Sequence, residues 1–164
     1  MPANPPLTPQ ERREKIAQIA ALPGRLVEAV AGLTPAQLTT HYLPGEWTVA
    51  QNVHHLADAH INAFARIKLM LTAERPTFFA WDQPSWANLP DANGAELGDS
   101  LALLRALHGR WVILLESLDE AQWRRVGLHP ERGEMTVDDQ LRTYSGHGEA
   151  HLQQIAKTLA AAKS

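Results

Sequence analysis

The sequence predicts an all-α protein, a four-helix bundle with long crossover connections. Four long segments place apolar residues at the three- and four-residue spacing of an amphipathic helix. Two long connections, one at 76–94 and one around Gly133, separate the last three of these segments. No segment shows the alternation of a convincing strand. Long connections favour crossovers over a simple up-down array of helices.

The first helix is expected from about Thr8 to Ala31. Glu11 stands three residues after Thr8, the spacing of a capping box at a helix start. Pro23-Gly24 is expected to kink or split this helix, because proline lacks the N–H that a helix interior uses. The segment 34–37 resembles a short additional turn of helix.

The second helix is expected to begin at Thr48, where Gln51 again stands three residues on, and its apolar stripe reaches about Leu71. The helical pattern then breaks from Pro76 to Gly94. This connection is too apolar for a disordered linker, so it either roofs a pocket or forms part of a dimer surface. Its aromatic residues are Phe78, Phe79, Trp81 and Trp86.

The third helix is expected from about Leu97 to Leu118 and the fourth from about Thr136 to Ala162. Both carry an apolar stripe on one face. A chain of 164 residues is long enough to bury a substantial core. We therefore expect a single domain over 1–164, with residues 1–7 flexible.

The composition excludes several classes of protein. The net charge of -3 gives no footprint for nucleic acid or an acidic membrane surface. The absence of cysteine excludes disulfides, thiolate metal ligands and a cysteine nucleophile. No apolar run has the length of a membrane span, and charged residues follow the start of the chain where a signal peptide would be apolar. A cytoplasmic protein without nucleic-acid or membrane partners is expected.

His147 and His151 are the most informative residues of the sequence. Their four-residue spacing stacks two imidazoles on one helix face, a turn apart. Such a pair, with a third histidine from a neighbouring helix, can hold a divalent metal and leave positions open for water or substrate. Gly146 and Gly148 weaken the same helix, which indicates close approach of another helix or a ligand. Close packing of helices around a buried histidine pair is the structural alternative.

Glu149 does not make this segment a zincin helix. In the H-E-x-x-H motif the glutamate directly follows the first histidine. Glu149 lies two residues after His147, roughly 200° around the helix, so it is expected to point away from a bound metal. The chain also lacks the Glu-x-x-His pairs of a ferritin-like di-iron site.

Periodicity leaves the third ligand open. His54 and His55 flank the apolar stripe of the second helix, whereas His60 falls on it. His54 and Asp58 form a four-residue pair that suits either chelation or an exposed ion pair. His60 and His108 lie mid-stripe and can line the interior without binding metal.

The segment 45–60 resembles the first signature of the DinB/YfiT-like superfamily. It combines a Trp-Thr helix start with the sequence His-Leu-x-Asp that begins at His55. Further matches occur in order along most of the chain, so the set is more specific than any one motif. These matches are Arg66 and Lys68, 107–111, His129-Pro130 and 144–151.

The resemblance implies a four-helix bundle with one divalent metal ion per chain, zinc or nickel, held by His55, His147 and His151. Similar members are described as proposed metal-dependent hydrolases. Related bundles are thiol S-transferases that use bacillithiol or mycothiol, and many members are homodimers. The segment 145–150 is smaller and more polar here than the family leads us to expect, which leaves the substrate open.

Three neutral imidazoles leave a metal its full charge, so either water or a coordinating thiol can be deprotonated. We therefore expect a small-molecule substrate, with a low-molecular-weight thiol in the transferase case. Asp58 is the candidate to orient the ring of His55 by accepting its other N–H. The catalytic residues stay open. Candidates are His60, His108 and His129 for pocket lining or proton transfer, and Arg66 for a substrate carboxylate.

Two other functions compete with the enzymatic one. A non-catalytic, stress-related metal-binding bundle would close the coordination sphere with a fourth protein ligand, such as His108 or His129. An α-helical dimerisation module would bind no metal, and His147 and His151 would then be ordinary packing contacts.

Overall fold

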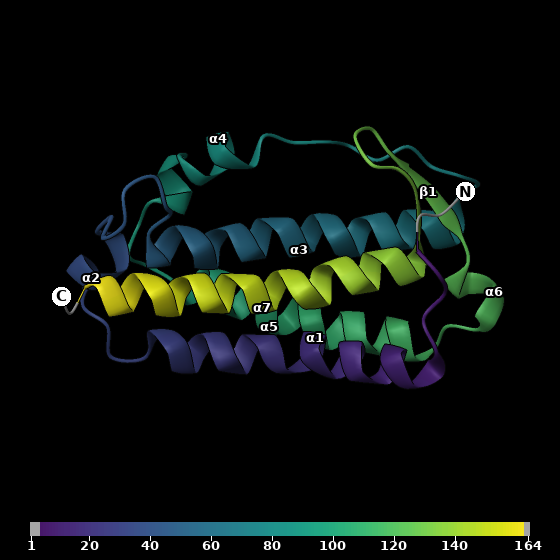
Figure 1. Ribbon diagram of the computed structural model, residues 1–164, viewed down its shortest axis with the longest axis horizontal. Helices are drawn as coiled ribbons and strands as arrows, with labels where there is room; N and C mark the ends of the chain where they lie inside the picture. The colour runs from purple at the N-terminus through teal and green to yellow at the C-terminus, as the bar shows by residue number, and fades with distance from the viewer. Residues whose placement is uncertain (1–3, 163–164) are drawn as a thin grey trace.

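Four long helices build the protein, as the computed structural model shows for residues 4–162 (Figure 1). The helices are α1 (Pro9–Val30), α3 (Val49–Thr72), α5 (Gly98–Glu116) and α7 (Val137–Ala161). The predicted four-helix bundle is confirmed. Shorter elements lie in the connections: α2 (Pro35–Thr39), α4 (Gln83–Ala87), the 3₁₀-helix η1 (Pro90–Ala92), α6 (Glu120–Trp123), β1 (Val126–His129) and β2 (Gly133–Thr136).

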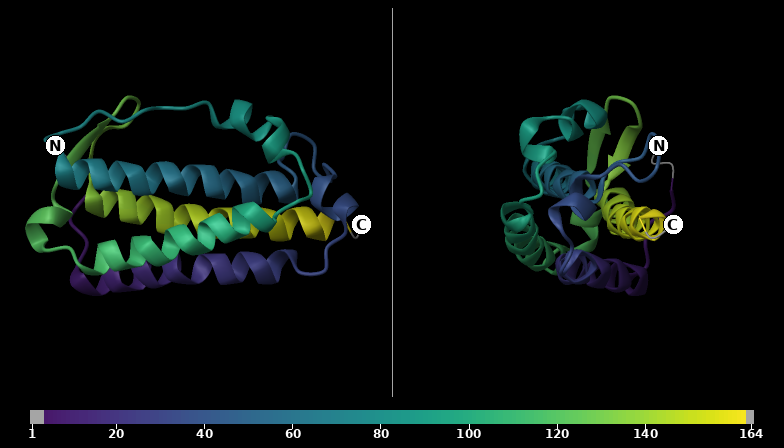
Figure 2. Two further views of the ribbon diagram at one scale, coloured as in Figure 1. Left: turned by 180° about the vertical axis from the view of Figure 1, so that it is seen from behind. Right: turned by 90° about the vertical axis from the view of Figure 1, so that its left-hand side faces the viewer.

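The order of the helices requires a long crossover. α1 and α7 run in one direction and α3 and α5 in the other (Figure 1). The chain therefore returns along the bundle between α3 and α5, and residues 73–97, the crossover segment, make this return with α4 and η1 against α3. α1 and α3 each pack against α5 and α7, so α1 lies diagonally opposite α3, and α5 lies diagonally opposite α7 (Figure 2).

Side-chain caps fix the helix starts where the sequence predicts them. Thr8 and Thr48 each accept from the backbone N–H three residues on, and the side chain at that position bonds back to the cap. Thr136 caps α7 in the same way, and Thr34 caps the short helix α2. Each box satisfies backbone donors that a helix start otherwise leaves without partners.

The helix is not split at Pro23-Gly24, because α1 continues through Pro23 to Val30. Pro23 still changes the helix locally. It has no N–H to donate to the carbonyl of Ile19 four residues earlier, so this carbonyl lacks its usual partner inside the helix.

The prediction of no strand is also wrong. β1 and β2 pair antiparallel, and Gly133 takes the positive φ of 72° that starts the return strand. Each strand has only four residues, too few for a visible alternation. Gly127 is required for close approach, because a Cβ there would lie 2.1 Å from the ring of Phe78. The hairpin thus joins the crossover segment, where Phe78 N donates to Leu128 O at 2.8 Å.

The start of the chain lies along α7. For the segment 1–7 the sequence predicts flexibility; residues 1–3 lie outside the described residues, and residues 4–7 make defined contacts. Leu7 is buried, and its N–H donates to Asp138 at 3.1 Å. Arg142 donates to the carbonyl of Pro5 at 2.9 Å. Within residues 4–162, no helix has both the length and the apolar character needed to cross a bilayer.

The core consists of two apolar clusters along the bundle axis. One cluster includes Ile19, Trp111 and Tyr144, and the other includes Leu22 and Leu104. On α5 and α7 the sequence between these clusters holds histidines. A layer of buried or half-buried imidazoles therefore interrupts the apolar core, and its members are His55, His60, His108, His147 and His151.

Gly148 and Gly146 provide a matched test of helix packing on α7. A Cβ on Gly148 would lie 2.6 Å from Cδ2 and 3.3 Å from Cγ of Leu22, whereas one on Gly146 meets no atom within 4 Å. Gly146→Ala is expected to stabilise the protein by about 1 kcal/mol. Gly148→Ala is expected to lose that gain and about 1–3 kcal/mol more, because the buried Leu22 must move. Urea unfolding with a chelator present measures both, and equal stabilisation by the two variants would contradict this packing.

Candidate functional site

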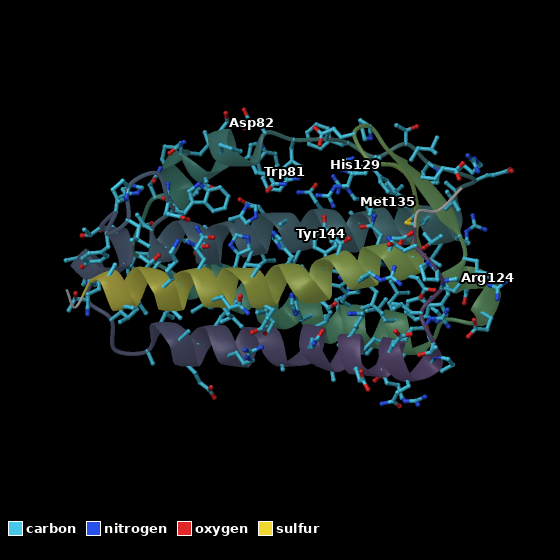
Figure 3. The ribbon with its side chains drawn as sticks, viewed as in Figure 1. Trp81, Asp82, Arg124, His129, Met135 and Tyr144 are labelled. Atoms are coloured by element: carbon cyan, nitrogen blue, oxygen red, sulfur yellow. The ribbon has the colours of Figure 1, made fainter. Side chains whose placement is uncertain are left out.

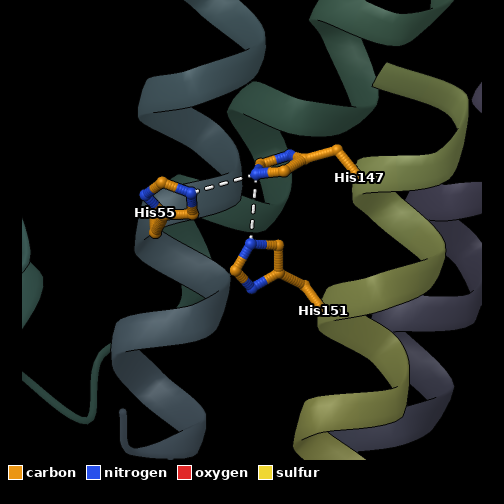
Figure 4. A group of neighbouring side chains, drawn as sticks. All are labelled: His55, His147 and His151. Atoms are coloured by element: carbon orange, nitrogen blue, oxygen red, sulfur yellow. Dashed lines mark hydrogen bonds between the residues drawn. The ribbon is translucent and has the colours of Figure 1, made fainter. Parts of the chain in front are cut away.

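Three histidines converge between α3 and α7 (Figure 4). Nε2 of His147 lies 3.2 Å from Nε2 of His55 and 3.1 Å from Nε2 of His151. One ligand atom from each residue lies within 4.8 Å of the other two. Two nitrogens bound to one zinc ion at about 2.0–2.1 Å are about 3.3 Å apart in tetrahedral geometry. The spacing of this three-histidine cluster therefore suits one metal ion.

His108 anchors a chain of buried imidazoles behind the cluster. Its Nδ1 lies 2.6 Å from the carbonyl oxygen of Ile19. This is the carbonyl that Pro23 leaves without its helical N–H partner. A carbonyl only accepts, so Nδ1 of His108 carries the hydrogen, and in the neutral ring Nε2 holds a lone pair.

The same reasoning assigns the donor and acceptor nitrogens of His60 and then of His147, which belongs to the three-histidine cluster. Nδ1 of His60 lies 2.8 Å from Nε2 of His108, so Nδ1 donates and Nε2 of His60 is an acceptor. Nε2 of His60 lies 3.3 Å from Nδ1 of His147. Nδ1 of His147 then donates, and its Nε2 presents a lone pair to the cluster. One carbonyl thus fixes the tautomer of three rings.

Asn52 fixes the tautomer of His151 independently. Its amide nitrogen donates to the carbonyl of Thr48 at 2.8 Å, which turns the amide oxygen toward Nδ1 of His151 at 2.7 Å. Nδ1 of His151 therefore donates, and Nε2 holds a lone pair. The lone pairs of His147 and His151 then face each other across 3.1 Å. A cation between them stabilises this arrangement.

His55 contacts His147 through its Nε2, and two tryptophans pack against its ring. Its ring centroid lies 4.6 Å from that of Trp47 and 5.7 Å from that of Trp81. Its Nδ1 is buried without a hydrogen-bond partner. Asp58, the residue expected to accept from this ring, therefore does not do so. The Asp58 carboxylate is half-buried on the side of His54 and Asp91, and burial and Asp91 raise its pKa.

Burial keeps the imidazoles of the cluster neutral. It lowers the pKa of His55 and His147 to about 3 and that of His151 to about 4, and the neighbouring rings add to the effect for His55 and His147. Burial also lowers the pKa of His60 and His108. A metal ion binds only the unprotonated nitrogen. The donors are therefore ready at neutral pH.

The other sequence candidates occupy different places. His54 bonds Ser100 at 2.8 Å and the carbonyl of Gly94 at 3.1 Å, so it neither joins the cluster nor pairs with Asp58. Glu149 points away from the cluster, as expected, and pairs with Arg25 at 2.5 Å. His60 and His108 lie behind His147 and are fully buried.

A cavity of about 140 Å³ adjoins the cluster. We call it the arginine pocket; it is lined by Arg66, Arg132, His129, Trp81, Tyr144 and His147, among others. Figure 3 shows Trp81, His129 and Tyr144 around one region beneath the crossover segment. The predicted candidates Arg66 and His129 thus lie beside the cluster, and the aromatic connection supplies Trp81 as a wall.

Sequence reasoning missed Asn52, Trp47 and Arg132. Asn52 has a visible signal, because a polar residue stands three positions before His55 at the buried start of α3. Trp47 precedes the Thr48 cap and lies outside the helix, so helical periodicity does not predict the direction of its side chain. Arg132 lies in the turn of the hairpin that was not predicted.

Comparison with known proteins identifies the family of this chain. The model of the DinB superfamily matches residues 18–155. YfiT of Bacillus subtilis (strain 168), named as a candidate metal-dependent hydrolase, is 41% identical over 150 residues, which cover 90% of this chain and 84% of that protein. A similarly named protein of Geobacillus kaustophilus (strain HTA426) is 45% identical over 148 residues, covering 89% and 83%.

A solved structure gives the same result for the fold. YfiT from Bacillus subtilis, described as a probable metal-dependent hydrolase with an unusual four-helix bundle topology, matches with a TM-score of 0.91 at 36% sequence identity. The match covers 96% of this chain and 91% of that chain. The family model and the relatives each span most of the sequence, and the chain belongs to the DinB superfamily.

Proposed function

We propose that this protein is a metal-dependent enzyme that holds one divalent ion, zinc or nickel, with His55, His147 and His151. The convergence of the three Nε2 atoms is the observation that carries the proposal. The donor set fits such an ion, because burial keeps the rings neutral and hydrogen bonds aim the lone pairs of His147 and His151 at one point.

An ion held by three neutral imidazoles lowers the pKa of water or of a thiol that it binds, which supplies a nucleophile near neutral pH. The candidates for a fourth protein ligand do not supply one. Both ring nitrogens of His108 are used, by Ile19 and His60. His129 lies outside the three-histidine group and accepts from the backbone N–H of Glu131 at 3.2 Å. This supports a site open to substrate over a closed structural site.

The surrounding residues order and shield the site. His60 and Asn52 hold the rings of His147 and His151 in the orientation that metal binding needs. Trp47 and Trp81 cover His55 and limit the access of water. Shielding of this kind strengthens electrostatic interactions inside a site.

The names of the relatives support hydrolysis, and we propose that the substrate is a small molecule. Transfer of a low-molecular-weight thiol is the second reaction that the same donor set allows. A homodimer and a cytoplasmic location stay predictions.

Metal content tests the site. Purified protein is expected to hold about one divalent ion per chain, as measured by elemental analysis. His55→Ala, His147→Ala and His151→Ala are each expected to lose it. His54→Ala is the matched control, because His54 neighbours His55 but bonds Ser100 and Gly94 instead. Wild-type protein that stays metal-free after reconstitution with zinc and with nickel would sink the proposal.

Turnover of an activated ester, with and without a low-molecular-weight thiol, tests the reaction class. A hydrolase is expected to convert the ester at the same rate without thiol and to lose this activity in His147→Ala. Conversion that requires the thiol, releases the alcohol and yields a thioester would replace hydrolysis with thiol transfer.

His60→Phe tests the orienting role of the imidazole chain. The substitution keeps an aromatic ring against Trp111 and Tyr144 but leaves Nδ1 of His147 without its acceptor. Metal affinity is expected to fall by about 10–100-fold in chelator competition, while the helical circular dichroism is retained. His54→Phe is the control, because it removes a buried imidazole that does not belong to this hydrogen-bonded series of histidines. Equal affinities of both variants and wild type would contradict the orienting role.

A further inference from the structure

Arg66 is a buried cation without a counter-ion. Its side chain donates to the hydroxyl of Tyr144 at 3.3 Å and to the backbone carbonyl of Phe79, and both acceptors are neutral. The residue is 8% exposed. Among residues 4–162, no carboxylate forms an ion pair with it. A charge removed from water without an opposite charge is costly, so such a residue usually has a function.

Arg12 is a buried arginine with a structural role in the same fold, and it provides a comparison for Arg66. It is 5% exposed, comparable with Arg66. Its guanidinium bonds both oxygens of Asp138, at 2.7 and 3.0 Å, and Glu120 at 2.6 Å. The charge of Arg12 is thus satisfied within the chain. That of Arg66 is not, and Arg66 lines a cavity instead.

The arginine pocket carries more positive than negative charge. Arg132, from the turn of the hairpin, lines it together with Arg66. Both arginines, with burial as the larger cause, lower the pKa of His129. Glu131 is the one carboxylate among the lining residues, and it is exposed to solvent. Gln140 adds a buried amide whose oxygen has no hydrogen-bond partner.

The pocket meets the three-histidine cluster at two residues. His147 lines the pocket and belongs to the cluster. Trp81 lines the pocket and packs on His55. Trp81 and Met135 give the walls an apolar part (Figure 3). A molecule in the pocket would therefore place an apolar body against Trp81 and an anionic end at the arginines, close to the cluster.

We propose that Arg66 and Arg132 bind a carboxylate group, and that the substrates of this protein are small carboxylic acids with an apolar body. That these acids are substrates rests on the proposed function, whereas their binding by the two arginines does not. Guanidinium groups are suited to carboxylates, because their N–H donors match the two oxygens. A substrate carboxylate would supply the counter-ion that Arg66 lacks in the protein.

Calorimetric titration of zinc-loaded protein with benzoate and with benzamide tests the proposal. The two probes share ring and size and differ in charge. Benzoate is expected to bind at least about tenfold more tightly than benzamide, since a charge-assisted pair is much stronger than a neutral hydrogen bond. Equal affinity for the two probes would overturn the proposal.

Three variants locate the carboxylate. Arg66→Gln and Arg132→Gln are each expected to weaken benzoate binding about tenfold or more and to leave benzamide binding unchanged. Arg132 is exposed, so its variant remains informative if Arg66→Gln does not fold. Arg124→Gln is the matched control, because Arg124 is also exposed and lies at α6, away from the pocket (Figure 3). Equal weakening in Arg124→Gln would show a general effect of charge and overturn the proposal.

Repeating the titrations with metal-free protein separates this inference from the proposed function. Benzoate binding that persists without metal and still depends on Arg66 supports the pocket, whatever the metal measurements give. Benzoate binding that disappears with the metal and ignores Arg66→Gln would place the carboxylate on the metal and overturn the pocket. In that case the metal-dependent function would stand alone.

Discussion

The missing N–H of Pro23 is the constraint on which the site depends. It leaves the carbonyl of Ile19 free inside an unbroken helix, and His108 donates to that carbonyl. This first hydrogen bond determines which nitrogen donates in the two that follow, from His60 to His108 and from His147 to His60. The result is a lone pair on Nε2 of His147, aimed at its partners. A substitution in α1, far from any substrate, therefore acts on the donor set through the tautomer of three rings.

The position of the histidines between two apolar clusters explains why they are neutral. Protonation would bury charge in a layer closed by Leu22 and Leu104 on one side and by Trp111 on the other. The same burial demands a partner for each ring nitrogen, and hydrogen bonds supply most of them. Nδ1 of His55 has tryptophan packing in place of a hydrogen bond, and the Nε2 lone pairs of His147 and His151 face each other without a donor between them. The fold thus accepts a polar layer in its core and orders it almost completely.

Helical periodicity and capping residues were sufficient to predict the bundle, because the long helices carry apolar stripes and α1, α3 and α7 each start at a threonine cap. They were not sufficient for the third histidine, since His54, His55 and His60 are all buried on a helix covered on most sides. Only the resemblance singled out His55. The hairpin escaped prediction because its strands are stabilised by the crossover segment, a contact between distant residues. Asn52 orients His151, not His55, and its position on α3 places it against α7.

The crossover topology divides the site between two kinds of structure. The histidines stand on the long helices, whereas Trp81, His129 and Arg132 come from the connections between those helices. Changes of length or sequence in those connections can reshape the pocket while the donor set is conserved. A family with this architecture can diversify its substrates by exchanging the connections while the helical bundle stays the same. Grafting residues 76–94 and 126–136 between relatives is a direct route to new selectivity.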